Sequence, residues 1–103
     1  MELIETPLFT RQVTAQMEED GYRLLQLHLV ARPDAGVIIP GSGGLRKVRW
    51  GLPGRGKRGG ARIIYYWAVQ RAQVYLLFLY PKNARADLTP AQLRTLRQLI
   101  DDA

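Results

Sequence analysis

The feature that most constrains this fold is a set of three strand-like segments in the middle of the chain. Residues 45–50 (LRKVRW) alternate in polarity, residues 61–69 (ARIIYYWAV) are rich in β-branched and aromatic side chains, and residues 74–80 (VYLLFLY) are apolar throughout. A strand that is apolar throughout is typical of the centre of a sheet, where both faces are covered. Because consecutive segments joined by short links usually pair, they predict a three-stranded antiparallel meander, with a hairpin turn at residues 70–73.

Two helices are expected before this sheet. Thr6 is a suitable N-cap residue, and Pro7 follows at the first helical position, where the missing N–H costs nothing. A second helix is expected over residues 22–32, after a polar break at residues 18–21. The Pro- and Gly-rich residues 33–44 predict a loop. A short strand can form in the first four residues of the chain.

A third helix is expected near the C-terminus. Thr89 and Pro90 repeat the pairing of cap and proline, and Gln92 completes a capping box. Its apolar face would pack on the sheet through Leu93, Leu96, Leu99 and Ile100. With 103 residues and neither a repeat nor a linker, the sequence predicts one small α+β domain over residues 1–103.

The charge of the chain is strongly clustered. The net charge is +6, and no acidic residue occurs between Asp34 and Asp87. Charge of one sign in one region repels itself unless a polyanion or an acidic protein neutralises it. The basic residues of this stretch are Arg46, Lys47, Arg49, Arg55, Lys57, Arg58, Arg62, Arg71, Lys82 and Arg85.

Residues 51–66 (GLPGRGKRGGARIIYY) match two nucleotide-binding motifs in form. Gly54-x-Gly56-x-x-Gly59 has the dinucleotide-binding pattern, and residues 51–57 form a P-loop that lacks its final Ser or Thr. Both motifs require a helix directly after the glycines, because the helix N-terminus holds the phosphates. The residues that follow predict a strand, so the sequence does not support a nucleotide site. A glycine-rich loop that carries Arg55, Lys57 and Arg58 instead suits an irregular RNA backbone.

The basic stretch offers a phosphate site and a route to RNA cleavage. Lys47 and Arg49 share one face of their predicted strand, and Arg62 shares a face with Ile64 and Tyr66 on the next. Guanidinium groups bind phosphate oxygens in a bidentate way, so Arg62 is the expected phosphate clamp. We expect Lys82 and Arg85 to complete a concave basic site. In such a site a 2′-OH can attack its own 3′ phosphodiester, with a lysine as base and Arg62 stabilising the added charge.

Other catalytic chemistry has little support in the sequence. The chain has no cysteine, and its single histidine, His28, has no ligand-type residue at metal-binding spacing. No cofactor or metal is expected. The aromatic residues of the predicted strands could stack on bases, but a place in the core is the favoured interpretation. They are Tyr65, Tyr66, Trp67, Tyr75 and Tyr80.

Three blocks of sequence resemble the RelE/HigB superfamily of bacterial type II toxins, and most of all its HigB-like branch. They are GGLRKVR (43–49), GKRGGARIIYYW (56–67) and YLLFLYPKNARADLT (75–89). The resemblance implies a ribosome-dependent mRNA endonuclease that cuts mRNA in the ribosomal A site and inhibits translation. It also implies a cognate antitoxin, HigA-like with a helix-turn-helix, through which alone the toxin would contact operator DNA.

The resemblance assigns roles to particular residues. The family's strand arginine corresponds to Arg62, and the lysine after its last strand corresponds to Lys82; the basic residues of its preceding strand fall at Arg46, Lys47 and Arg49. The chain departs from the family at Asn83, where some members have a second arginine, and it has no Tyr or His after Tyr80. The predicted catalytic residues are therefore Arg62, Lys57 and Lys82, with Lys47 as a further candidate base. The predicted RNA-binding residues are Arg46, Lys47, Arg49, Arg55, Arg58 and Arg85.

Two other functions fit the same charge. One is a non-catalytic RNA- or ribosome-binding module, and cleavage of mRNA on translating ribosomes would separate it from a toxin. The other is a protein-interaction domain for an acidic partner, which would bind in the absence of RNA and would not arrest growth. The N-terminus has acidic residues where a signal peptide requires basic ones, and no apolar run reaches about 18 residues. The sequence therefore predicts a soluble cytoplasmic protein without a membrane contact.

Overall fold

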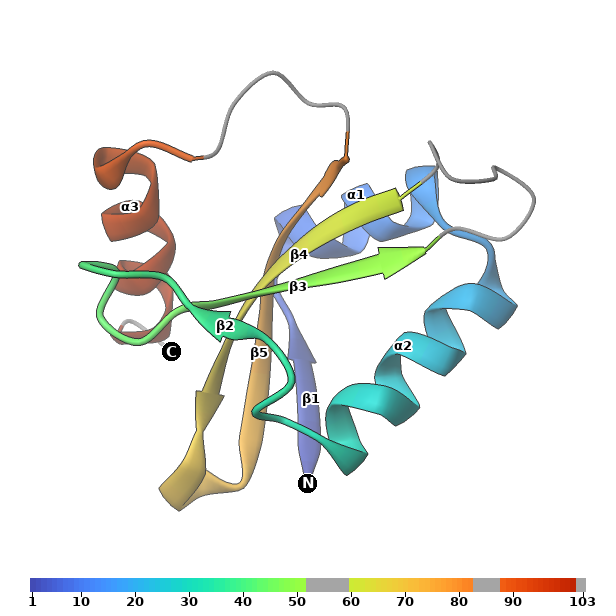
Figure 1. The fold of residues 1–103 in the computed structure, drawn as a ribbon, viewed down its shortest axis with the longest axis horizontal. Coiled ribbons are helices and arrows are strands. Elements are labelled where there is room, and N and C mark those ends of the chain that lie inside the picture. The colour runs from blue at the N-terminus through green and yellow to red at the C-terminus, as the bar shows by residue number, and fades with distance from the viewer. Residues whose placement is uncertain (52–59, 83–87, 102–103) are drawn as a thin grey trace.

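The computed structural model of the chain describes residues 1–51, 60–82 and 88–101. One strand, two helices, four further strands and a final helix follow one another along the described chain, as an α+β fold (Figure 1). In order, the elements are β1 (Glu2–Glu5), α1 (Pro7–Gln16), α2 (Glu19–Ala31), β2 (Val37–Ile38), β3 (Arg46–Gly51), β4 (Gly60–Ala68), the short 3₁₀ turn η2 (Val69–Arg71), β5 (Gln73–Pro81) and α3 (Pro90–Asp101).

The described strands form one mixed sheet in the order β1-β5-β4-β3-β2. The predicted antiparallel meander corresponds to β3, β4 and β5. β1 pairs in parallel with β5, so β5 lies between two strands, which explains its apolar sequence. β2 is an addition to the predicted fold: Val37 and Ile38, expected in a loop, pair with β3 at the edge of the sheet.

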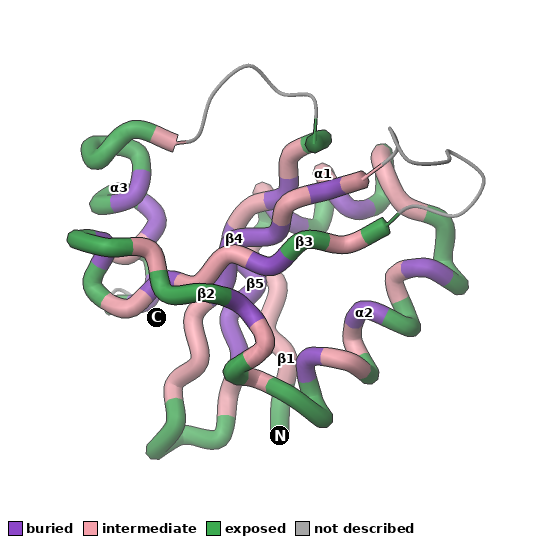
Figure 2. The backbone as a smooth tube through the Cα atoms, viewed as in Figure 1, coloured by how far each residue is buried: buried purple, intermediate pink, exposed green. Residues whose placement is uncertain are grey.

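Helices cover both faces of the sheet (Figures 1 and 2). On one face, α1 and α2 contribute Phe9, Val13, Leu25 and Leu29 to a buried cluster with β3, β4 and β5. On the other face, α3 packs through Leu93, Leu96 and Ile100 against a second cluster. The other buried members of that second cluster are Ile64, Tyr75 and Leu77 of the strands and Leu45, directly before β3. The third leucine predicted to pack there, Leu99, is 41% exposed, so that expectation is wrong.

The predicted helix caps are confirmed by their hydrogen bonds. The Thr6 hydroxyl accepts from the Phe9 N–H at 3.1 Å. At α3, the Thr89 hydroxyl accepts from the Gln92 N–H at 3.1 Å, and the Gln92 side chain accepts from the Thr89 N–H at 2.8 Å. These bonds satisfy N–H groups that a helix start leaves unpaired. α2 begins at Glu19, earlier than predicted, because acidic residues in a first turn are favourable at the positive end of the helix dipole.

The hairpin between β4 and β5 contains two irregularities. Its turn is η2 followed by Ala72, which has a positive φ of 51°. Along the strands, Ile64 pairs with Phe78 but Tyr65 pairs with Leu76, so β5 has one extra residue, Leu77. Such a β-bulge reverses the alternation of faces beyond it.

Candidate nucleic-acid interface

Three side chains form one row across the middle of the sheet. Arg62 of β4 lies directly opposite Arg49 of β3 on one side and directly opposite Tyr80 of β5 on the other. Residues opposite each other on neighbouring strands point to the same face, with their Cβ atoms about 5 Å apart. This face is the α3 side of the sheet, because Ile64 and Tyr80 both belong to the cluster that α3 covers. Arg62 therefore lies at the centre of the row.

Two lysines flank this row on the same face. Lys47 lies opposite Ile64, one row toward α3. Lys82 lies on the other side of the row, where its N–H donates to the Gly60 carbonyl at 2.8 Å. The Lys82 side chain passes over Gly60: a Cβ built at Gly60 would lie 3.5 Å from the Lys82 Cδ. We call Lys47, Arg49, Arg62 and Lys82 the basic cluster.

The bulge at Leu77 places Tyr80 and Lys82 on the face of Arg62. Tyr66 lies opposite Tyr75, and both belong to the α3 side. Strict alternation from Tyr75 would put Tyr80 and Lys82 on the opposite face. Because the bulge adds one residue, Tyr80 lies opposite Arg62 instead.

The basic cluster is accessible, and no described carboxylate neutralises its arginines. Arg49 and Lys82 are exposed, whereas Arg62 and Lys47 are half-buried. Within residues 1–51, 60–82 and 88–101, neither Arg49 nor Arg62 forms an ion pair with a carboxylate. Two guanidinium groups side by side without an acid repel each other. Such an arrangement favours binding of an anion that contacts both.

A small pocket of about 60 Å³ adjoins the basic cluster on its α3 side. Lys47 and Tyr80 line it together with apolar side chains of β4, of α3, of the residue after β2 and of the segment before α3. These are Ile39, Ile64, Leu88 and Leu93. The Tyr80 ring also contacts the Phe78 ring, with 6.0 Å between their centroids. Packing with these neighbours fixes where the Tyr80 ring lies.

The structure does not bring Arg46 to this face. Arg46 alternates with Lys47 and lies on the side of α1 and α2, where its Nη1 donates to the carbonyls of Gly36 at 2.8 Å and of Asp34 at 3.3 Å. Its guanidinium carbon is also 5.9 Å from the centre of the Trp67 ring. Arg46 therefore holds the segment before β2 rather than joining the basic cluster.

The other predicted site residues divide between described and undescribed parts of the chain. Arg55, Lys57, Arg58 and Arg85 lie outside the described residues, as does Asn83. His28 packs against Trp50 on the α2 side, with 5.3 Å between the ring centroids, and so lies away from Arg62. Among the described residues, no group of His, Cys, Asp and Glu could hold a metal ion. No helix in the described part of the chain is long and apolar enough to cross a membrane.

Two of the five predicted aromatic residues lie in the buried core, and the other three are half-buried. Tyr65 is fully buried, and its hydroxyl accepts from the Gly36 N–H and donates to the Pro33 carbonyl, each at 2.7 Å. Burial raises the pKa of Tyr65, although the Gly36 hydrogen bond opposes this shift. Tyr75 is buried as well. Tyr80 is the aromatic residue that lies in the row of Arg62.

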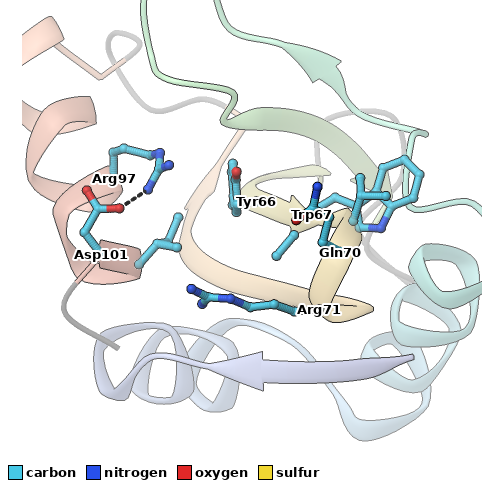
Figure 3. Close-up of a pocket in the computed structure, with 9 residues that line it drawn as sticks. Tyr66, Trp67, Gln70, Arg71, Arg97 and Asp101 are labelled. Atoms are coloured by element: carbon cyan, nitrogen blue, oxygen red, sulfur yellow. Dashed lines mark hydrogen bonds and ion pairs between the residues drawn. The ribbon is translucent and has the colours of Figure 1, made fainter.

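A larger cavity of about 360 Å³ lies at the far end of the same face, between the β4–β5 hairpin and the end of α3 (Figure 3). Arg97, which sequence reasoning missed, lies 4.7 Å from the Tyr66 ring centre. It donates to the Asp101 carboxylate at 2.7 Å and to the Gly43 carbonyl at 3.0 Å. Arg71 extends along the cavity toward α3 (Figure 3). Because Asp101 neutralises Arg97 here, this cavity is less cationic than the basic cluster.

Comparison with a solved structure supports the fold. The chain is similar to a double arginine-to-alanine mutant of the E. coli toxin RelE in the free state. The two superpose with a TM-score of 0.62 at 13% sequence identity, and the alignment covers 93% of this chain and 95% of that one.

Comparison with protein families identifies the chain. Residues 30–102 match the family model described as the RelE toxin of the RelE/RelB toxin–antitoxin system. The match includes every described strand except β1, and thus the whole row of Arg49, Arg62 and Tyr80. Together with the fold, it supports a toxin that acts as a ribosome-dependent mRNA endonuclease and that has an antitoxin as its partner. The chain belongs to the RelE toxin family.

Proposed function

We propose that the basic cluster binds the mRNA backbone in the ribosomal A site, and that cleavage there proceeds by attack of a ribose 2′-OH without a metal ion. The observation that carries this proposal is the position of Arg62. It lies between Arg49 and Tyr80 on an accessible face and is paired with no described carboxylate. A phosphate contacted by both arginines would gain charge-assisted, bidentate hydrogen bonds.

The proposed reaction needs two proton transfers and stabilisation of one extra negative charge. Attack by O2′ forms a bond to phosphorus, and the bond from phosphorus to the 5′ oxygen breaks. The products are a 2′,3′-cyclic phosphate and a 5′-hydroxyl. A base removes the proton from O2′, an acid supplies one to the leaving oxygen, and fixed cations stabilise the charged intermediate.

The residues divide these roles by their chemistry. A guanidinium group stays protonated, so Arg62 stabilises charge and does not transfer protons. The candidates for proton transfer are Lys82, which lies next to the row over Gly60, and Lys57. Lys47 is a further candidate, since it lies one row away on the same face. Arg55, Arg58 and Arg85 are proposed to extend the phosphate contacts.

The partners follow from the proposed substrate. We infer that the toxin acts in the cytoplasm on mRNA in translating ribosomes, where the ribosome positions the codon. We also infer that the antitoxin is HigA-like and contacts operator DNA through its own helix-turn-helix. The ribosome accounts for a site in which neither Arg49 nor Arg62 pairs with a described carboxylate.

The test is expression in bacteria with and without the neighbouring open reading frame. We expect growth arrest and new mRNA 5′ ends inside translated codons, both relieved by the neighbouring frame. Arg62→Ala should abolish the cuts, whereas Arg11→Ala, an equal charge change on exposed α1, should not. A folded Arg62→Ala protein that still cuts at the wild-type rate would refute the role of Arg62. Co-sedimentation of the wild type with ribosomes without any cuts would favour the non-catalytic binding module.

The chemistry of the cut has a separate test. Purified toxin is incubated with ribosomes stalled on a defined mRNA, and the product ends are analysed. We expect a 2′,3′-cyclic phosphate on the upstream fragment. A phosphorothioate at the scissile position should slow cleavage equally with Mg²⁺ and with added Mn²⁺ or Cd²⁺. Rescue by the thiophilic ions would instead indicate a metal bound to that oxygen and contradict the metal-independent step.

A further inference from the structure

Tyr80 differs chemically from every other group in the row of Arg62. Arginine and protonated lysine donate hydrogen bonds and accept none, whereas a phenol hydroxyl does both. A ribonucleotide presents two features to such a row: a phosphate, which only accepts, and a 2′-OH, which must donate its hydrogen bond to something. Of the described residues in the row, only Tyr80 can accept it.

The spacing of the strands allows the arginines to contact the phosphate while Tyr80 contacts the 2′-OH. Neighbouring strands are about 4.8 Å apart, so the phenol lies one strand beyond the guanidinium of Arg62. The 2′-OH and the 3′ phosphate of one nucleotide are attached to adjacent carbons of the ribose. A nucleotide whose phosphate contacts Arg49 and Arg62 can therefore present its 2′-OH to the strand on the other side of Arg62, which is β5. Tyr80 occupies the β5 side.

The surroundings of Tyr80 make it a fixed contact rather than a mobile one. The residue is half-buried, and its ring packs against Phe78. It also lines the small pocket with Leu88 and Leu93. An aromatic side chain has only two rotatable bonds, so little conformational entropy is lost when its hydroxyl contacts a ligand.

We propose that the Tyr80 hydroxyl accepts a hydrogen bond from the 2′-OH next to the bound phosphate, and so lets this site distinguish ribose from sugars that lack this donor. The inference rests on the proposed function, because it requires RNA at the basic cluster. It assigns Tyr80 a specificity-determining role in the bound ground state: because the 2′-OH has one hydrogen, this bond is given up when the base takes the proton from O2′. It assigns no proton transfer to Tyr80.

The test compares two oligonucleotides of one sequence, one made of RNA and one with 2′-fluorine on every sugar. Fluorine keeps the ribose-like sugar pucker but cannot donate a hydrogen bond. Dissociation constants are measured at low salt, off the ribosome, for the wild type, Tyr80→Phe and Tyr66→Phe. Tyr66 is the matched control, because it lies on the same face of β4 but at the far cavity.

The expected result is a loss of discrimination in one variant only. One hydrogen bond corresponds to about twofold to tenfold in affinity. The wild type and Tyr66→Phe should bind RNA tighter than the fluorinated strand by that factor, whereas Tyr80→Phe should bind the two alike.

Three results would overturn the inference, and they differ from one another. Equal binding of both strands by the wild type would show that the site does not read the 2′-OH. Unchanged discrimination in Tyr80→Phe would show that another group reads it. Failure of the wild type to bind either strand, at a salt concentration where electrostatic contacts are strong, would refute the RNA interface itself and with it the role of Tyr80.

Discussion

Arg49 and Arg62 lie directly opposite each other on neighbouring antiparallel strands, and no described carboxylate pairs with either guanidinium. Like charges in this position destabilise a sheet. A protein that retains such a pair sacrifices some stability for a site that binds an anion. The effect of this arginine pair on stability can be measured on the free protein.

Removal of one arginine of this pair should stabilise the free protein. We expect Arg49→Ala to raise the free energy of unfolding by about 0.2–1 kcal/mol at low salt, because the repulsion disappears. The gain should shrink as salt screens exposed charges over about 10 Å at 0.1 M. Urea unfolding at two ionic strengths measures it. Arg11→Ala, on the exposed side of α1, is the control and should show no such gain; equal behaviour of the two variants would contradict the prediction.

The two arginines of β3, Arg46 and Arg49, should have different effects when replaced. Arg49 lies on the face of the basic cluster, so Arg49→Ala should lower the slope of log affinity for single-stranded RNA against log salt by about 0.7. Arg46 donates to two carbonyls on the other face, so Arg46→Ala should leave that slope unchanged. It should instead lower the stability by about 1–3 kcal/mol. Titrations at several salt concentrations and urea unfolding test both, and a reduced slope in Arg46→Ala would be the contrary outcome.

The contact between Gly36 and Tyr65 should tolerate no added atoms. A Cβ at Gly36 would lie 2.7 Å from the Tyr65 Cε1 and 2.8 Å from its hydroxyl, inside a fully buried site. Gly36→Ala should therefore destabilise the protein by about 1–3 kcal/mol through overpacking. Thermal unfolding is the measurement. Gly51→Ala is the control, since a Cβ there meets open space, and equal midpoints in the two variants would be evidence against this packing.

Tyr65→Phe should separate the hydrogen bonds of this residue from its packing. The ring remains, but the buried Gly36 N–H loses its acceptor and the Pro33 carbonyl loses its donor. The cost of leaving such groups unpaired is about 1–3 kcal/mol. Urea unfolding should show the loss, with the m-value unchanged. A stability within a few tenths of a kcal/mol of the wild type would mean that water satisfies both groups.

Stability should fall at alkaline pH, and Tyr22 should contribute to the fall. Burial, followed by the hydrogen bond to Glu5, raises the pKa of Tyr22 well above its ordinary value of 10.0. The folded state therefore keeps a proton on Tyr22 that the unfolded state releases above pH 10. The contribution of Tyr22 to the free energy of unfolding is thus complete below pH 10 and declines as the pH rises. Tyr22→Phe should lose less stability between pH 10 and 11, by up to about 1.4 kcal/mol. Urea unfolding at pH 7, 10 and 11 gives the comparison; parallel declines in the two proteins would refute it.

Several parts of the fold could be predicted because local chemistry decides them. Thr6 and Thr89 cap their helices since their hydroxyls accept from N–H groups three residues ahead, whatever the rest of the chain does. The strand character of residues 61–68 follows from their β-branched and aromatic side chains. A strand at this place excludes both nucleotide-binding motifs, because each requires a helix after the glycines. The shared face of Lys47 and Arg49 needs only regular alternation.

The candidate site could be predicted only in part, because its geometry depends on pairing between strands. The charge of the basic stretch could be read directly, but not that Arg46 would hold carbonyls on the opposite face. Nor could the sequence show that β2 would extend the sheet or that Arg97 would bridge α3 to Gly43. These contacts join segments that are far apart along the chain, and many registers are compatible with the same local preferences.

By itself, the sequence determined the composition of this site: a cationic, carboxylate-poor stretch on a β-rich segment. Only the tertiary structure decided which groups meet, and the bulge at Leu77 shows why. Regular alternation along β5 would place Tyr80 and Lys82 on the face opposite to Arg62. The extra residue Leu77, which the pairing with β4 accommodates, places both on the same face as Arg62. A bulge forms where the packing of two faces is best satisfied by a shift in register, and that balance exists only in the assembled sheet.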